Sequence, residues 1–184
     1  MKKWNKSYTW AIIVVAAFVV MFIVFYWLDN RAFKFEGSEA IEEEMKDWDP
    51  VRAEKGEPHS IDGEILYYSL DCFKHYGSWK KYVGLEEAER GFIKSNVKTA
   101  DDIGAIAVLY YQQAHAGTYQ NGASAYRDDC TVFILDPDTK KILAQETLKG
   151  GSPSSTTSGG DRTGAAPNVA SCKKLAEKMV AEMK

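Results

Sequence analysis

Three cysteines and a histidine are the residues of this chain best suited to metal or thiol chemistry. Cys72 and His75 are separated by two residues, a spacing at which two side chains can bind one zinc ion, and Cys130 and Cys172 would complete a set of four ligands. Structural zinc sites generally use two closely spaced pairs, and here only one pair is close. The cysteines therefore leave three hypotheses open: a metal site, a disulfide between two of the three thiols, and ordinary buried thiols.

Other catalytic chemistry has little support in the sequence. The chain has no Gly-x-Ser-x-Gly motif, and its densest group of serines, in 152–158, lies in a glycine-rich segment that cannot hold a nucleophile rigidly. His59 and His115 are isolated histidines. Asp128 and Asp129 are neighbours in a predicted strand, where successive side chains point to opposite faces, so we do not expect them to act jointly. We predict neither an enzyme nor a cofactor.

A recognition surface is the better-motivated kind of site. Four tyrosines line the strongest predicted hairpin: Tyr110, Tyr111, Tyr119 and Tyr126. Tyrosine combines apolar area with a polar group and is enriched where protein surfaces meet partners. The alternative hypothesis is that these rings form ordinary cross-strand pairs on a half-exposed sheet.

Residues 8–28 contain no charged side chain and consist almost entirely of apolar and aromatic residues. A helix of this length spans about 31 Å, close to the roughly 30 Å hydrocarbon core of a bilayer. Aromatic residues lie at both ends, as expected of rings at the membrane interface. The run is longer than the apolar part of a cleaved signal peptide, and no small-residue cleavage site follows it. We predict a retained, single-pass transmembrane helix.

The distribution of basic residues gives the predicted orientation. The tail formed by residues 1–7 contains a dense group of lysines, which favours a cytoplasmic N-terminus. An equal number of basic residues follows the helix within about 20 positions, but more sparsely, and a long domain can cross regardless of its charge. We therefore expect the rest of the chain to be extracytoplasmic.

The charge of the chain limits its partners. It carries 23 basic and 26 acidic residues, a formal net charge of −3, and no basic cluster long enough to form a polybasic patch. Nucleic-acid binding needs a clustered basic surface, so nucleic acid is not a predicted partner. The lipid bilayer is one.

Residues 29–60 are predicted to be a stalk or linker with a short helix at 39–48. Ile41, Met45 and Trp48 recur at helical spacing and give this helix an apolar side. The proline that follows ends it, because the residue before a proline avoids the helical conformation.

Residues 61–184 are predicted to form one domain, starting with a strand at 63–70. Apolar residues in 85–95 recur near helical spacing, which predicts a turn or two of helix there. The glycine- and serine-rich segment 150–167 is predicted to be a mobile loop, since it has no large apolar side chain to pack. A helix at 168–183 then follows, with Asn168 as its predicted N-terminal cap. Its apolar stripe consists of Val169, Cys172, Ala176, Met179, Val180 and Met183.

The strongest β signal lies in the middle of the domain. Strands at 106–119 and 126–135 are joined by Asn121-Gly122, a dipeptide that accepts the positive φ angles of a tight hairpin turn. A second turn at Asp136-Pro137 leads to a strand at 142–148. Strands joined by short turns form an antiparallel meander, and the C-terminal helix would cover one face of it. The predicted fold class is therefore α+β, with a two-layer domain after the transmembrane helix.

The run from Tyr126 to Pro153 carries a resemblance to known proteins. Its landmarks are Leu135-Asp136, Thr139-Lys140, Ile142, Lys149-Gly150-Gly151 and Ser152-Pro153. In this order they resemble a pattern in uncharacterised bacterial envelope proteins and lipoproteins with one small α+β domain. The resemblance implies a bacterial membrane-anchored protein and adds no activity and no site residues.

These observations predict a single-pass membrane protein that holds a non-catalytic binding or scaffold module of the bacterial cell envelope. Its partner would be an envelope protein or a cell-wall component. Two alternatives remain: a thiol- or metal-dependent enzyme centred on Cys72 and His75, and an accessory subunit of a membrane complex that faces the cytoplasm, where all three thiols would be reduced.

Overall fold

The computed structural model describes residues 14–15, 17–21, 33–70, 91–155, 160 and 162–183. The chain forms two compact units, residues 1–32 and 33–184. The parts of the predicted membrane span that are described, 14–15 and 17–21, are helical with exposed side chains, and the remainder of 8–28 lies outside the described residues. Among the described residues, no helix is both long and apolar enough to cross a membrane. The transmembrane helix stays a prediction.

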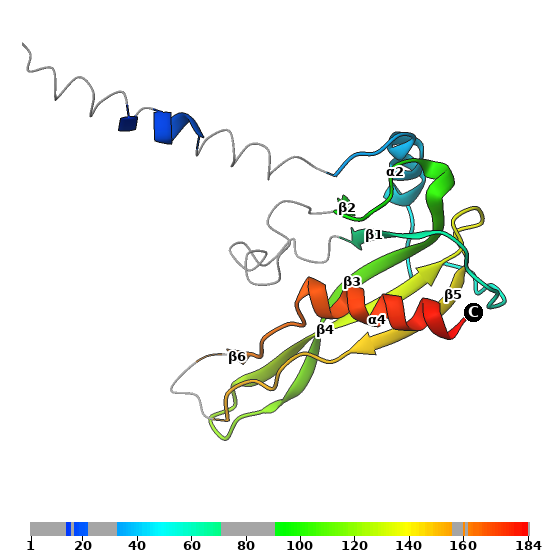
Figure 1. Cartoon of the computed structure of the whole chain (residues 1–184). Helices are drawn as coiled ribbons and strands as arrows, with labels where there is room; N and C mark the ends of the chain where they lie inside the picture. The colour runs from blue at the N-terminus through cyan, green and yellow to red at the C-terminus, as the bar shows by residue number, and fades with distance from the viewer. Residues whose placement is uncertain are drawn as a thin grey trace, which may run out of the picture. The chain divides into compact units, whose positions relative to one another are not determined.

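A mixed β-sheet with a C-terminal helix makes residues 33–184 an α+β fold (Figure 1). The strands are β1 (Glu64–Leu70), β2 (Gly91–Ile93), β3 (Ile103–Thr118), β4 (Ser124–Leu135) and β5 (Ile142–Leu148). Their order across the sheet is β2-β1-β3-β4-β5, and a short strand, β6 (Arg162–Thr163), pairs with β4.

The antiparallel meander predicted from the turns is present as β3, β4 and β5. In the first turn Gly122 has a φ of 84°, which its lack of a side chain permits, and Tyr119 N donates to Ala123 O at 2.8 Å. In the second turn the Asp136 carboxylate accepts from Thr139 N at 2.7 Å. The first turn contains the predicted glycine, and the second contains the predicted aspartate. Strand β5 has the predicted bounds.

The sheet as a whole is mixed because β1 runs parallel to β3, in register from Ile65 opposite Ala105 to Leu70 opposite Tyr110. β2 lies antiparallel on the other side of β1. Phe92 in β2 packs edge-on against a tyrosine of β1, with ring centroids 5.4 Å apart. The helix predicted within 85–95 is therefore wrong for residues 91–93, which form a strand whose Phe92 is buried. Residues 85–90 lie outside the described residues.

The alternation of side chains along the strands creates one apolar cluster on each face of the sheet. Helix α4 (Val169–Glu182) covers the first face (Figure 1). Asn168 caps this helix by accepting a hydrogen bond from Ser171 N at 2.8 Å. The predicted C-terminal helix is confirmed, and its buried residues are Cys172, Ala176, Met179 and Val180.

The second cluster includes residues that the sequence analysis assigned to a stalk. Helix α2 (Ser38–Lys46) contributes Met45, which is 0% exposed. Trp48, just after the helix, is 8% exposed. The Trp48 ring lies edge-on against Phe133, with centroids 5.7 Å apart, and its Nε1 donates to Lys140 O at 3.2 Å. The compact unit therefore begins at residue 33 rather than 61, because the apolar side of α2 is covered by the sheet.

Truncation of Met45 tests this wider domain boundary. We expect Met45→Ala to lower the free energy of unfolding by about 2–4 kcal/mol, because it opens a cavity in a closed core. The matched control is Val51→Ala, at a side chain that is 87% exposed, which should change it by less than about 0.5 kcal/mol. Urea denaturation of the full chain in detergent micelles measures both. Equal, small effects would show that α2 packs independently of the sheet.

Candidate functional site

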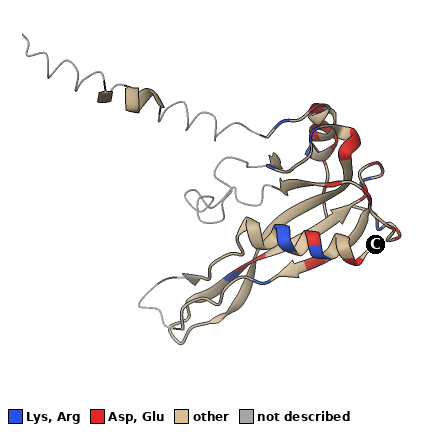
Figure 2. Ribbon diagram, viewed as in Figure 1, with Lys and Arg blue, Asp and Glu red and all other residues tan. Residues whose placement is uncertain are grey.

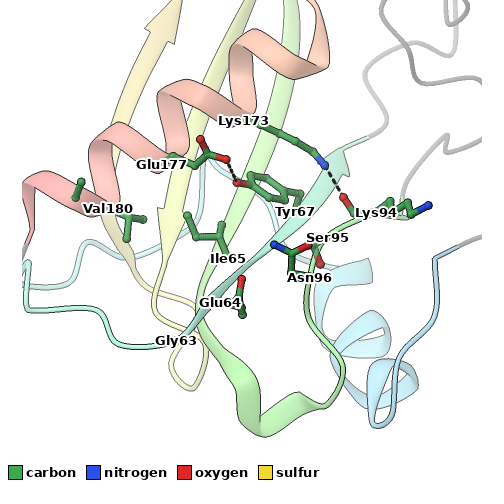
Figure 3. A pocket seen from close by; sticks show the side chains of 11 residues that line it. Gly63, Glu64, Ile65, Tyr67, Lys94, Ser95, Asn96, Lys173, Glu177 and Val180 are labelled. Atoms are coloured by element: carbon green, nitrogen blue, oxygen red, sulfur yellow. Dashed lines mark hydrogen bonds between the residues drawn. The ribbon is translucent and has the colours of Figure 1, made fainter.

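A groove of about 440 Å³ lies between α4, the start of β1 and the segment that follows β2 (Figure 3). Side chains of both charges stand around an apolar floor. The residues that line the groove include Glu64, Ile65, Tyr67, Lys94, Asn96, Lys173, Glu177 and Val180. A groove that combines apolar area with a few polar groups is a general property of binding sites.

The groove exists because β2 is short. It pairs with β1 only from Tyr67 to Ser69. The chain after Ile93 leaves the sheet, so within the described residues the first half of β1 pairs with β3 alone. Residues 63–65 then line the groove from below, and α4 crosses above them (Figure 3).

Tyr67 lies at the centre of the polar contacts in the groove. The Lys173 Nζ sits 4.5 Å from the centroid of the Tyr67 ring and donates to the backbone carbonyl of Lys94. The Tyr67 hydroxyl donates to Glu177 Oε1 at 3.3 Å. Burial raises the pKa of Tyr67, with the Glu177 charge as a further cause, and burial lowers the pKa of Lys173.

Lys173 and Glu177 project from the same side of α4 because they are four residues apart. Figure 2 shows acidic and basic residues together on this helix. The groove thus holds an amine over the face of the Tyr67 ring and a carboxylate at its hydroxyl, all with defined partners. Such an arrangement can orient a ligand that carries both charges along an apolar surface.

The structure brings together two of the three predicted thiols. Cys130 and Cys172 are both 0% exposed and lie in the cluster beneath α4. Cys72 and His75 lie outside the described residues, so the hypothesis of a site centred on them stays open. Within the described parts of the chain, no three metal-binding side chains come together.

The four predicted recognition tyrosines do not share one surface. Tyr111 is 1% exposed beneath α4, whereas Tyr110 packs in the cluster on the opposite face. Tyr126 lies edge-on against a histidine, with ring centroids 5.8 Å apart, and the Tyr119 hydroxyl donates to Ser154 O at 2.5 Å. The alternation of a strand places the adjacent Tyr110 and Tyr111 on opposite sides.

The adjacent acids Asp128 and Asp129 are both buried, in different surroundings. Asp129 accepts from Arg127 Nε at 2.7 Å and from Gly150 N at 2.9 Å, and the Arg127 hydrogen bond holds its pKa below the usual range. Asp128 is 3% exposed, and among the described residues its Oδ2 has no hydrogen-bond partner. Burial raises the pKa of Asp128 to about 6.

Sequence patterns alone do not single out Tyr67, Lys173 or Glu177 as site residues. The four-residue spacing of Lys173 and Glu177 is visible in the sequence, but it is a common pattern on exposed helix faces. The chain matches no protein-family model, and neither a curated protein nor a solved structure matches it.

Replacement of Asp128 tests its raised pKa. The folded state holds this proton more tightly than the unfolded state, so folding stability at this residue falls as the pH rises from about 4 to about 6. Asp128→Asn should remove that fall and be more stable than the wild type above pH 6 by about 1–3 kcal/mol. Urea denaturation across this pH range measures the effect.

Asp129→Asn is the matched variant, and its expected effect on folding stability at neutral pH is opposite to that of Asp128→Asn. The pKa of Asp129 is lowered, so its contribution to stability is present at neutral pH and is lost as the pH falls through the lowered pKa. This variant should be less stable than the wild type at neutral pH. The same response from both variants would contradict the assignment of different environments.

Proposed function

We propose that the chain is a single-pass membrane protein whose extracytoplasmic domain is a non-catalytic binding module, and that its groove holds an extended peptide segment of an envelope protein. One observation supports a peptide as the ligand: the groove runs along the first half of β1, where β3 pairs with one edge of the strand and no described strand pairs with the other. Strand edges with uncovered backbone groups pair readily with extended chains.

The lining of the groove supports an extended peptide over other ligands. Ile65 and Val180 offer an apolar floor to an aliphatic side chain. Lys173 and Glu177 offer opposite charges within one helical turn of each other, which suits a peptide with an acidic and a basic residue. The groove has room for a short segment of extended chain and is open to solvent, as peptide-binding grooves must be.

The described part of the N-terminal helix supports an anchor. The side chains of Val15, Phe18 and Val20 are 62%, 63% and 59% exposed. An exposed run of large apolar side chains on one helix calls for an apolar environment, and the hydrocarbon of a bilayer provides one. Together with the charge-free composition of residues 8–28, this favours insertion in the membrane.

Charge reversal in the groove tests peptide binding. The probe is an array of short random peptides, and the strongest binder is then measured by fluorescence anisotropy with the full chain in micelles. We expect Lys173→Glu and Glu177→Lys each to weaken that peptide about tenfold or more. Lys178→Glu is the control, because Lys178 lies on the same helix with its side chain 61% exposed and outside the groove. N-methylation of alternate peptide bonds should also abolish binding, since it removes strand pairing.

An equal loss with Lys178→Glu, or a binder indifferent to backbone methylation, would contradict a strand in the groove. The same conclusion would follow if no peptide of the array bound the folded protein more strongly than it bound a heat-unfolded preparation of the protein.

Proteolysis in spheroplasts tests the orientation. A peptide tag fused after Lys184 should be removed by an added protease without lysis, because the domain lies outside. The chain should also remain in the membrane fraction after alkaline carbonate extraction, and a chain lacking residues 1–28 should be released. Protection of the tag until lysis would favour the alternative of an accessory subunit that faces the cytoplasm.

A further inference from the structure

Two thiols from distant parts of the chain meet where α4 covers the sheet. Cys130 lies in β4 directly opposite Tyr111 of β3, and both side chains belong to the cluster beneath α4. Cys172 lies on the buried side of α4, with its Sγ 3.5 Å from the Tyr111 hydroxyl. A tyrosine hydroxyl and two sulfurs therefore occupy one buried position between helix and sheet.

Both cysteines adjoin Tyr111: Cys130 is its partner across the β3–β4 ladder, and the Cys172 sulfur lies near its hydroxyl. A hydrogen bond with the Cys130 thiol holds the pKa of Cys172 below its ordinary value, and burial raises the pKa of Tyr111. Both cysteines are present as thiols and both are fully covered. Because both thiols adjoin the same tyrosine, they are neighbours on two different elements, as a disulfide between helix and sheet requires.

We propose that Cys130 and Cys172 form a disulfide that joins α4 to β4. The oxidant is an external disulfide, either a small molecule or a protein. One cysteine thiolate attacks a sulfur of that disulfide and expels one thiolate, and the second cysteine attacks the mixed disulfide and expels the other. Two cysteine thiols are thereby oxidised, the external disulfide is reduced to two thiols, and the two cysteine protons pass to the departing sulfurs.

The coverage of both sulfurs determines when this reaction takes place. An external disulfide cannot reach either cysteine while α4 is docked, so exchange occurs before the helix packs or while it is detached. Once formed, the link holds the helix that carries Lys173, the residue after Cys172, against the sheet. The disulfide would thus keep α4 in place as one wall of the groove under conditions that destabilise the rest of the domain.

Refolding in a glutathione redox buffer tests the pairing without reference to the compartment. The full chain is unfolded and reduced in detergent, refolded with oxidised and reduced glutathione, treated with N-ethylmaleimide and digested for mass spectrometry. We expect one dominant linked pair, Cys130 with Cys172, in the wild type and equally in Cys72→Ser. The linked form should have a folding equilibrium constant about a hundredfold or more above that of the reduced form, because a long loop is closed.

The variants Tyr111→Phe and Cys172→Ala distinguish loss of the disulfide from loss of the folded structure. Tyr111→Phe removes only the hydroxyl and should leave the link intact. Cys172→Ala should lack it, with both remaining cysteines alkylated and a native circular dichroism spectrum under reducing conditions. If Cys172→Ala does not fold, the linked pair in the wild type and in Tyr111→Phe still decides the question.

Links through Cys72, or alkylation of both Cys130 and Cys172 after refolding in oxidising buffer, would overturn the proposal. The formation of the Cys130–Cys172 disulfide in cells rests on the extracytoplasmic location proposed above. Its formation in the redox buffer does not depend on that location. A linked pair in the buffer combined with a protected C-terminal tag in spheroplasts would therefore refute the location and leave the pairing standing.

Discussion

The pairing of β3 with β4 is the constraint on which the rest of the domain depends. The two strands are in register from Ile106 opposite Leu135 to Thr118 opposite Ser124, with one irregularity between His115 and Gly117. Because side chains alternate between faces, a slip of one residue would exchange the two apolar clusters. This register places Cys130 and Tyr111 beneath α4 and Phe133 beneath Trp48. Helices on both faces thus take their positions from one hairpin.

The groove is a consequence of how the sheet ends. β1 is held along its whole length by β3, and only its second half by β2. A full-length β2 would cover the positions that now line the groove, and without α4 the groove would lose a wall. Tyr67 joins these parts, since its hydroxyl binds Glu177 and its ring lies under Lys173. Binding capacity here arises from incomplete strand pairing next to a well-packed helix.

Buried polar groups show how differently one strand can treat neighbouring residues. Asp129 has a guanidinium and a backbone amide as partners, whereas burial without equivalent partners makes Asp128 easier to protonate. Gly150, whose amide serves Asp129, leaves no room for a side chain: a Cβ there would lie 2.1 Å from Asp128 O. The described ends of the segment 150–167 are held by backbone hydrogen bonds: Gly164 N donates to Tyr126 O of β4 at 3.0 Å, and Gly151 N donates to Ala165 O at 2.6 Å.

The sequence by itself determined the elements whose signals are local. The Asn-Gly turn, the Asp-Pro turn, the bounds of β5 and the Asn168 cap are written in a few adjacent residues each, and all of them are present. The helical spacing around Met45 was also readable, but the surface that buries it was not. Local patterns specify an element and the side it must cover, not the partner that covers it.

The tertiary structure alone decided the parallel placement of β1, the inclusion of α2 in the domain, the groove around Tyr67 and the placement of Cys130 and Cys172 beside Tyr111. Each joins residues that are far apart in the chain. Such contacts depend on the path of the connections and on which apolar faces compete for burial, and neither is encoded by the spacing of neighbouring residues. Four tyrosines that looked like one surface in the sequence were separated for the same reason, because pairing and packing assigned each strand position to a face.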